Sequence, residues 1–327
     1  MNLTILSTYP PRECGIASFS NDLKTNLELW GQNVSILAMN DNGSYKYPQE
    51  VVFELNEDSR DDYLISAQFV NTADIDAVFI EHEYGIFGGR DGEYVLDFVS
   101  DLEKPFILNT HTVLPKPQLH QKKVLSQLGK QATAVICMTN RSAELLNRVY
   151  NVSSDKVFIV PHGVPTFRKL PRDEIKKAYG ISGCPLVTTF GFIGPGKGIE
   201  IGINAVAKLK EKYPNIIYLV AGETHPNLKK RIGESYRDSL LELIDLLDMH
   251  NNIRFINRFI SLKELNEILY MTDVYLTPYP QKNQAVSGTL AYAIGCGRAI
   301  VSTPYEYSLE VLGNKRGLVA ETAAPNE

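Results

Sequence analysis

Short apolar runs alternate with amphipathic stretches along this 327-residue chain, and that alternation restricts the possible folds more than any other feature. Short apolar runs between turn signals are typical of buried strands, whereas apolar residues spaced three and four apart are typical of helices. The clearest helical stripe comprises Ile16, Phe19, Leu23, Leu27 and Trp30. The alternation predicts an α/β fold with parallel sheets that carry helices on both faces.

The strand and helix patterns occur in both halves of the chain. The predicted strands are residues 3–6, 34–37, 77–80, 106–109, 134–138, 157–160, 186–190, 216–221, 253–256, 274–277 and 299–302. The predicted helices of the second half are residues 199–211, 237–247, 262–271 and 288–294. Three prolines interrupt the pattern at residues 161–171. We therefore predict two doubly wound domains, residues 1–163 and 164–327, that face each other across a ligand-binding cleft.

Composition excludes several classes of protein. A net charge of −5 argues against a nucleic-acid binder, and 44% hydrophobic with 22% charged residues is typical of a soluble globular protein. The four cysteines lie too far apart for a zinc motif, which fits a reducing cytoplasm. No signal peptide or membrane-spanning run is evident. We expect a cytoplasmic protein without a metal site, in which peripheral contact with the inner face of a membrane stays open.

Residues 189–200 form the most informative segment for function. After an apolar run come four glycines and Lys197, followed by a helical stripe, an arrangement that brings backbone N–H groups and one cation to an anion such as phosphate. The P-loop pattern fits from Gly191 to Lys197 but has Gly198 where a hydroxyl must bind Mg²⁺. The dinucleotide fingerprint fails at Ile199. The segment predicts a phosphate-binding turn and disfavours ATP hydrolysis; a tight turn with a solvated lysine is the alternative.

A second candidate anion site lies in residues 283–297. Ser287, Gly288 and Thr289 stand at a predicted helix start, where two hydroxyls and several N–H groups could surround a diphosphate. The alternative is a serine that simply caps the helix, with small residues packing behind it. Lys197, from a neighbouring predicted strand end, favours the anion site.

A loop in the first half is both acidic and aromatic. Neighbouring side chains of an extended segment point to opposite faces, so Glu81, His82 and Glu83 do not all converge on one metal ion. Carboxylates that accept sugar hydroxyls, next to rings that stack on sugar C–H faces, suit a saccharide better. We expect Glu83, Tyr84 and Phe87 to contact such a ligand.

Two further strand ends carry candidate residues. His111 follows the predicted strand at 106–109, where it could donate to a sugar hydroxyl or act as a general acid or base. A structural histidine bonded to a backbone carbonyl is the alternative. Gly15, in the loop after the first strand, could admit a phosphate or sugar to backbone N–H groups, unless the loop is an ordinary one. His162 lies at the predicted domain boundary, where we expect a structural or domain-interface role.

These elements, in this order, resemble the GT-B retaining glycosyltransferases of family 4, also called glycosyl transferases group 1. The likeness spans almost the whole chain and is carried by the glycine loop after the first strand, His111, residues 159–164, residues 191–198 and residues 293–302. It implies two Rossmann-like domains facing across a cleft, with the acceptor on the N-terminal domain and a nucleotide sugar on the C-terminal one. The family's C-terminal helix, which returns to the first domain, is expected to be missing here.

The resemblance implies roles for individual residues. Lys197 and His111 would be catalytic, the first by binding the donor diphosphate and the second by contacting the transferred sugar or the acceptor. Donor contacts are expected from Gly15, Gly196, Lys197, Gln284, Ser287, Gly288, Thr289 and Glu310, and acceptor contacts from Glu83, Tyr84 and Phe87.

The chain departs from the family pattern at three positions. Phe192 stands where the family has an arginine, and Gln284 and Tyr292 stand where it has two glutamates eight positions apart. Some members resemble this chain in reading Ser-Gly-Thr-Leu-Ala-Tyr-Ala, so the change is consistent with a subgroup. In that subgroup Glu310 would be a substitute carboxylate.

The resemblance implies metal-independent, retaining transfer of a hexose, with mannose or glucose favoured, from a GDP- or UDP-linked donor to a glycan, lipid-linked or other hydroxyl acceptor. No cofactor is expected, because the nucleotide sugar is a substrate. The leaving phosphate can take the acceptor's proton, which fits a sequence with no evident nucleophile and base pair. The alternatives are a catalytically impaired sugar-nucleotide-binding or scaffolding protein and a nucleotide-sugar epimerase.

Overall fold

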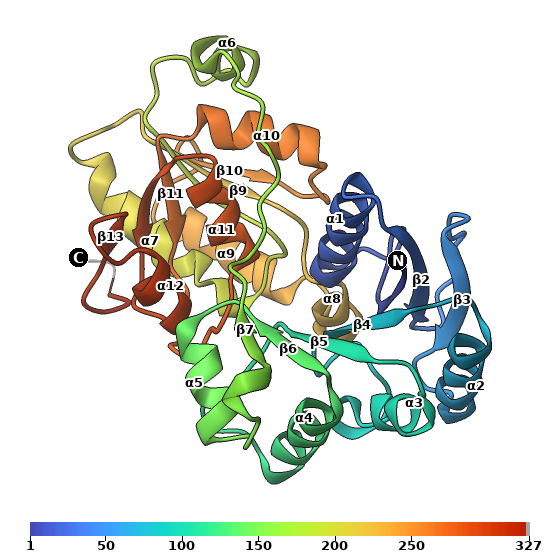
Figure 1. Ribbon diagram of the computed structural model, residues 1–327. Helices are drawn as coiled ribbons and strands as arrows, with labels where there is room; N and C mark the ends of the chain where they lie inside the picture. Colours follow the sequence, from blue (N-terminus) through green and yellow to red (C-terminus); the bar gives the residue numbers. More distant parts are fainter. Residues whose placement is uncertain (325–327) are drawn as a thin grey trace. The chain divides into compact units, whose positions relative to one another are not determined.

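The computed structural model describes residues 1–324, apart from the side chain of Asn227, and divides into two compact units. Unit 1 comprises Met1–His162, and unit 2 begins at Gly163 (Figure 1). The observed boundary lies next to the predicted one. Each unit has its own parallel sheet and its own hydrophobic core.

Unit 1 is a doubly wound α/β domain. Its elements are β1 (Asn2–Ser7), α1 (Gly15–Leu29), β2 (Asn33–Asn40), β3 (Val51–Asn56), α2 (Arg60–Thr72), β4 (Ala77–His82), η1 (Arg90–Gly92), α3 (Val95–Asp101), β5 (Phe106–Thr110), α4 (Leu119–Gln131), β6 (Ala134–Cys137), α5 (Asn140–Arg148), η2 (Ser154–Lys156) and β7 (Val157–Ile159). The parallel strands follow the order β3-β2-β1-β4-β5-β6-β7. The order reverses between β1 and β4, so their carboxyl ends form the switch point where such sheets bind ligands.

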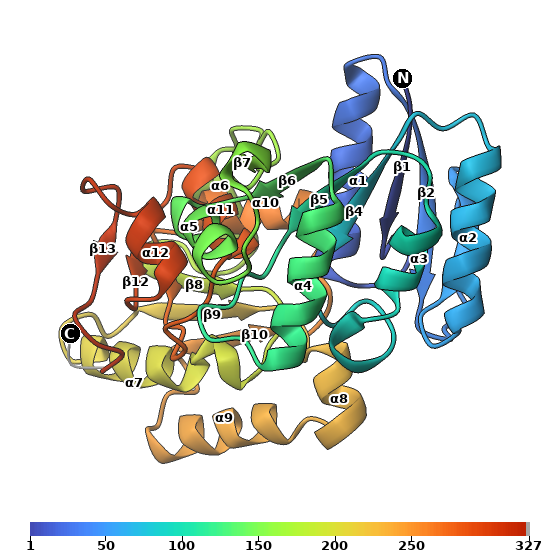
Figure 2. The same cartoon turned by 60° about the horizontal axis from the view of Figure 1, so that its bottom comes forward.

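The two faces of this sheet carry different helices. The apolar side chains of α1 pack with those of β1 and β2 in one cluster, and α2, α3, α4 and α5 contribute to a larger cluster on the other face. Figure 2 shows α1 and α2 on opposite sides of these strands. Nearly every strand residue at the centre of the sheet is buried, which explains the continuous apolar runs.

Two local expectations differ from the structure. Trp30 was expected to continue the buried stripe of α1, but the helix ends at Leu29 and the Trp30 side chain is 84% exposed. The predicted stripe is therefore wrong at Trp30, because α1 ends one residue before it. The sequence also missed β3, a strand with one buried residue, Leu55, in which Glu54 interrupts the apolar residues.

Unit 2 has the same plan with six strands. Its elements are α6 (Arg172–Ala178), β8 (Leu186–Phe190), η3 (Pro195–Lys197), α7 (Ile199–Lys210), β9 (Ile217–Ala221), α8 (Pro226–Ile232), α9 (Ser235–Leu246), β10 (Ile253–Ile256), α10 (Leu262–Met271), β11 (Val274–Thr277), α11 (Gly288–Gly295), β12 (Ala299–Ser302), α12 (Glu306–Val311) and β13 (Leu318–Val319). The strand order is β10-β9-β8-β11-β12-β13, again parallel throughout. The order reverses between β8 and β11.

Helices cover both faces of the second sheet. The apolar residues of α7 and α9 pack in one cluster, and Figure 2 shows these two helices along the same face. Side chains of α10, α11 and α12 pack in the cluster on the other face. The two predicted doubly wound domains are therefore confirmed. Among the described residues, no helix is long and apolar enough to cross a membrane.

Candidate functional site

The carboxyl ends of β8 and β11 form the switch point of unit 2, where an open parallel sheet binds its ligand. The loop after β8 carries Lys197, and the loop after β11 leads through Ser287 into α11. A Cβ atom built on Gly191 would lie 3.0 Å from a methyl group of Thr289 and 3.9 Å from Nζ of Lys197. The two segments that the sequence proposed as anion sites therefore meet.

A cluster of hydroxyl groups surrounds the Lys197 ammonium. Its Nζ donates a hydrogen bond to Oη of Tyr279 at 2.6 Å. That oxygen lies 2.9 Å from Oγ1 of Thr289 and 3.4 Å from Oγ of Ser287. Ser287 also caps α11 by accepting a hydrogen bond from the N–H of Leu290 at 3.3 Å. We call Lys197, Tyr279, Ser287 and Thr289 the lysine–hydroxyl cluster.

Tyr279 is the member of this cluster that sequence reasoning missed. Its side chain is 3% exposed, and its ring stacks on Tyr305 with centroids 4.9 Å apart. Burial raises the pKa of Tyr279, but the Lys197 ammonium and hydrogen bonds within the cluster outweigh burial and bring the pKa below its ordinary value. No spacing rule points to Tyr279, which lies 82 residues from Lys197 in the chain.

Two glycines are required by the geometry of this turn. Gly198 has φ of +60°, and a Cβ on it would lie 2.1 Å from the carbonyl oxygen of Pro278. Gly191 has φ of +112° and stands against Thr289. Only glycine adopts such backbone angles without strain and lets two loops approach this closely. Gly198, the residue that breaks the P-loop pattern, therefore serves the contact between the loops that follow β8 and β11.

An aromatic cluster lies beside the lysine–hydroxyl cluster. Phe192, at the position where the resemblance implied an arginine, packs against His225 at 5.3 Å and Phe259 at 6.0 Å between ring centroids. These residues follow β8, β9 and β10, and the Phe259 side chain is 40% exposed. Partial burial, and then the Lys197 ammonium, lower the pKa of His225. We call Phe192, His225 and Phe259 the aromatic cluster.

Three more residues of unit 2 were predicted to contact the donor: Gln284, Gly196 and Gly288. Gln284 is exposed, and its amide donates to the carbonyl of Val286 in its own loop at 2.7 Å. Gly196 lies in η3 with open space around it, and Gly288 is the first residue of α11.

Glu310, a predicted donor contact, and Tyr292 both lie on helices. Glu310 is on α12, where burial and then the charge of Glu310 raise the pKa of Tyr307 to about 12. The ring of Tyr292, at the position where the resemblance implied a second glutamate, packs against Phe167 with centroids 6.0 Å apart.

Unit 1 contains a buried pair that the sequence did not reveal. Nε2 of His111 lies 2.6 Å from Oε2 of Glu81, and that oxygen also accepts a hydrogen bond from the Asn109 amide at 2.8 Å. Glu81 is completely buried at the end of β4, directly across the ladder from Asn109 on β5. The ring of Phe19 on α1 contacts the imidazole edge-on at 4.8 Å. Strand pairing alone brings these residues together.

Glu81 and His82 lie on opposite faces of the sheet, as expected for neighbours on a strand. His82 packs against Tyr84 and Phe87, and neither of its ring nitrogens has a hydrogen-bond partner. Burial lowers the pKa of His82 to about 3. His82 is therefore a neutral core residue. Among residues 1–324, no cluster of three or more His, Cys, Asp or Glu side chains is placed to hold a metal.

The three predicted acceptor residues differ in exposure. Glu83 accepts a hydrogen bond from Thr112 at 2.6 Å and another from the N–H of Tyr84 at 3.0 Å. Tyr84 packs against the core of unit 1, and Phe87 is 5% exposed within it. Both rings therefore shape the loop from inside, and Glu83 is the member of the three with the more polar surroundings.

A hollow of about 440 Å³ borders the same loop and is lined by Arg90, Leu119, His120 and Lys123. His120 bonds two carboxylates of the loop, with Nδ1 3.1 Å from Asp91 and Nε2 3.1 Å from Glu93. Leu119, the first residue of α4, is 89% exposed beside these basic side chains. The hollow therefore places basic side chains beside an exposed apolar one, and Asp91 also lies 3.6 Å from Nε of Arg90.

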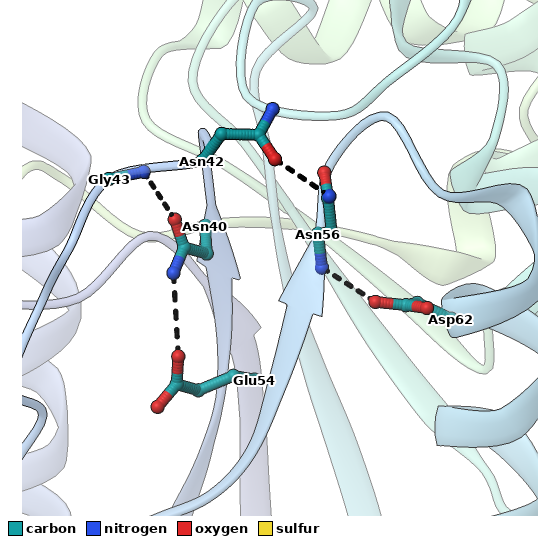
Figure 3. Close-up of a pocket in the computed structure, with 6 residues that line it drawn as sticks. All are labelled: Asn40, Asn42, Gly43, Glu54, Asn56 and Asp62. Carbon is teal, nitrogen blue, oxygen red and sulfur yellow. Dashed lines mark hydrogen bonds between the residues drawn. The ribbon is translucent and has the colours of Figure 1, made fainter.

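A second hollow of unit 1, of about 300 Å³, lies between the ends of β2 and β3 (Figure 3). Its polar groups bond mainly to each other: Asn56 donates to Asn42 at 2.7 Å, and the N–H of Gly43 donates to Asn40 at 2.9 Å. Asp62 accepts from the backbone of Asn56 at 2.8 Å. These bonds hold the loop between the two strands to the start of α2.

Gly15, the predicted donor contact of unit 1, is the first residue of α1. A Cβ built on it would meet nothing within 4 Å, and no side chain caps this helix start. The loop therefore leaves backbone N–H groups of the first turn without a side-chain acceptor, which is compatible with an anionic or hydroxyl ligand. His162 contacts Phe19 at 5.4 Å between ring centroids, in keeping with its expected structural role.

Comparison with known protein families agrees with this geometry. Residues 171–327 match the family described as "Glycosyl transferases group 1", a match that lies within unit 2. Alpha-D-kanosaminyltransferase of Streptomyces kanamyceticus is 27% identical over 143 residues. That stretch covers 42% of this chain and only 36% of the relative, so the chain matches little more than a third of that protein's length.

Solved structures show the same fold over the whole chain. The Anabaena protein HepE, crystallised with UDP and glucose, has a TM-score of 0.77 and 14% identity, covering 100% of this chain and 87% of its own. A glycosyltransferase from Rickettsia africae has a TM-score of 0.75 and 16% identity, covering 99% and 85%. The chain therefore has the GT-B fold of these proteins, as the sequence predicted.

Proposed function

We propose that this protein is a glycosyltransferase that moves a sugar from a nucleotide-sugar donor to a hydroxyl acceptor. The observation that carries the proposal is the lysine–hydroxyl cluster at the switch point of unit 2. One ammonium, the N-terminus of α11 and two hydroxyl side chains converge there, which is a suitable environment for a diphosphate. The family match of residues 171–327 supports the same conclusion.

The aromatic cluster extends this donor site. A nucleoside diphosphate has an anionic group and a planar base, and unit 2 offers a cation beside three aromatic rings at successive strand ends. We place the diphosphate on the lysine–hydroxyl cluster and the base against Phe192 and Phe259. The base is uracil or guanine, and neighbours solved with UDP favour uracil.

The chemical step is a retaining displacement on a hexose, as in family 4. The bond between the sugar C1 and the diphosphate oxygen breaks, and its electron pair leaves with the diphosphate. A bond forms between C1 and the acceptor oxygen on the same face, and the acceptor's proton passes to the leaving phosphate oxygen. Lys197 and the helix start stabilise the negative charge that develops on the diphosphate. No metal ion is needed for this step, and mannose or glucose is the favoured sugar.

Unit 1 supplies the acceptor side in this proposal. His111, held by Glu81, contacts the transferred sugar or the acceptor hydroxyl. The hollow lined by Arg90, Lys123 and Leu119 suits an acceptor that has anionic and apolar parts, such as a lipid-linked glycan, at the surface of a membrane. Glu83 adds a carboxylate that can accept from sugar hydroxyls.

A panel of UDP- and GDP-linked hexoses, offered with soluble and lipid-linked hydroxyl acceptors, tests the proposal. Released nucleotide, glycosylated product and product anomer are measured for the wild type, Lys197→Ala and the control Lys208→Ala, which removes an exposed lysine of α7. We expect Lys197→Ala to lower turnover at least about tenfold, equivalent to about 1.4 kcal/mol of transition-state stabilisation, and the control to retain it. Equal activity in the two variants contradicts the diphosphate role of Lys197.

Other outcomes of the panel separate the alternatives. Donor binding without turnover of any acceptor favours a sugar-nucleotide-binding or scaffolding protein, which Gln284 and Tyr292 in place of carboxylates would explain. Conversion of the donor sugar to its epimer identifies an epimerase. An inverted product anomer contradicts the retaining step.

A further inference from the structure

The Lys197 ammonium is held by one aromatic side chain in two ways. Its Nζ donates to Oη of Tyr279 at 2.6 Å and lies 4.4 Å from the centre of the same ring. A lysine side chain has four rotatable bonds, so an unattached ammonium samples many positions. Two contacts with a single phenol restrict it to one position relative to that ring.

The phenol itself is rigidly placed. Tyr279 is almost fully buried, and its ring lies nearly parallel to that of Tyr305, with an interplanar angle of 21°. The Tyr305 hydroxyl is in turn 2.9 Å from Oγ1 of Thr277 on β11. Because Oη of Tyr279 accepts from Lys197, its own proton is available to Thr289, 2.9 Å away. Lys197 is therefore tied through Tyr279 to the sheet and to the first turn of α11.

We propose that Tyr279 is the positioning residue for Lys197, fixing the ammonium so that its other N–H groups meet the donor diphosphate. An ammonium has three N–H donors, and the bond to Tyr279 leaves two for phosphate oxygens. Phe192 removes the second cation of the family, so the placement of the remaining one matters more here. A cation held in place before binding loses less conformational entropy when the ligand arrives. This inference rests on the donor site proposed above and adds a residue to it.

The arrangement also predicts how binding depends on pH. The pKa of Tyr279 lies below its ordinary value, so the phenol loses its proton earlier than an ordinary tyrosine as pH rises. The phenolate would neutralise Lys197 and repel the diphosphate. The other titratable groups around it are Lys197, Tyr218, Tyr275 and Tyr305; burial raises the pKa of each of these three tyrosines, so they stay neutral. Donor binding should therefore weaken as pH rises through the pKa of Tyr279.

The variant Tyr279→Phe tests the hydroxyl alone, because it keeps the ring under Lys197 and the stack on Tyr305. Tyr218→Phe is the matched control, since it removes another buried hydroxyl of unit 2 that bonds Thr189 at 2.8 Å. Affinities for UDP, GDP and inorganic pyrophosphate are measured by calorimetry between about pH 7.5 and pH 10, with Lys197→Ala as the reference. Thermal melts establish that each variant is folded.

For each of the three ligands that the wild type binds, we expect Tyr279→Phe to weaken binding about tenfold, the effect typical of a hydrogen bond to a charged group. The decline in affinity at high pH should also become smaller in this variant. The control should change affinity less than about twofold. If Lys197→Ala weakens binding but Tyr279→Phe behaves like Tyr218→Phe, the positioning role is wrong and the donor site stands. If the wild type binds none of the three ligands, the donor site is wrong and the positioning role falls with it. An alkaline decline that is unchanged in Tyr279→Phe also overturns the inference.

Discussion

Glu81 and His111, thirty residues apart in the chain, meet at the ends of two neighbouring strands with 2.6 Å between Oε2 and Nε2. Glu81 is fully buried, so it reaches a ligand only through the histidine. Oε1 of the same carboxylate is buried without a hydrogen-bond partner, a costly state that is uncommon in folded proteins. The pair fixes the orientation of the imidazole and leaves Nδ1 as the ring nitrogen for other contacts.

Removal of the Glu81 charge should impair catalysis more than donor binding. Glu81→Gln keeps the size of the side chain but weakens the hydrogen bond that orients His111, so we expect kcat to fall about tenfold while the donor KM changes less than about twofold. Steady-state kinetics with the donor identified by the panel provide the measurement. Asp245→Asn, which alters an exposed carboxylate–histidine pair with His250 in unit 2, is the control. Equal kcat values for the two variants contradict a positioning role of Glu81.

The aromatic cluster should contribute affinity for the base and none for the diphosphate. We expect Phe259→Ala and Phe192→Ala each to weaken binding of UDP or GDP about tenfold, because stacking on a base contributes about 1–3 kcal/mol. Binding of inorganic pyrophosphate should be unchanged, which makes that ligand an internal control. Calorimetry with both ligands checks the prediction. A parallel loss of pyrophosphate binding would mean that these rings support the loop and do not contact the base.

The stability of unit 1 should fall in mild acid because of His82. Its pKa of about 3 in the folded protein lies below its ordinary value of 6.5, so the unfolded chain takes up a proton first. Well above pH 6.5 the histidine is neutral in the folded and the unfolded protein, so it costs no stability. As pH falls from 6.5 toward 3, protonation of the unfolded chain lowers the free energy of unfolding, by about 2 kcal/mol at about pH 5. His82→Phe should remove this part of the pH dependence, measured by urea unfolding at about pH 7 and pH 5. His250→Asn, at an exposed histidine, should show the same change in unfolding free energy between these two pH values as the wild type.

Gly198 should be far less tolerant of a side chain than Gly196, two residues away. Gly198→Ala places a methyl group 2.1 Å from the oxygen of Pro278 at a φ of +60°, so we expect a loss of about 2 kcal/mol or more in unfolding free energy. Gly196→Ala meets open space and should change stability by less than about 0.5 kcal/mol. Thermal or chemical denaturation of both variants checks this. Similar stabilities would show that the turn rearranges at little cost.

The sequence alone determined the architecture, because buried parallel strands must be apolar and amphipathic helices must have a period near 3.6 residues. The runs at residues 186–190 and 274–277 coincide with β8 and β11. The sequence failed where a segment is half exposed, as in β3, or where an apolar residue lies just beyond a helix end, as does Trp30. It also identified Lys197, Ser287 and Thr289 as candidates, since glycine-rich turns and helix starts have local signatures.

The tertiary structure decided which of these residues act together. Lys197 meets Tyr279 across 82 residues, and Glu81 meets His111 across thirty, because parallel strands bring the carboxyl ends of distant segments to one edge of a sheet. No local pattern encodes such contacts, since they depend on strand order and register. Gly198, which excluded a P-loop, and Gly191 both let the loops after β8 and β11 approach closely, and only the tertiary structure shows this role. The sequence therefore determined the fold and identified Lys197 and His111 as candidates. Strand order and register placed Tyr279 and Glu81 beside them.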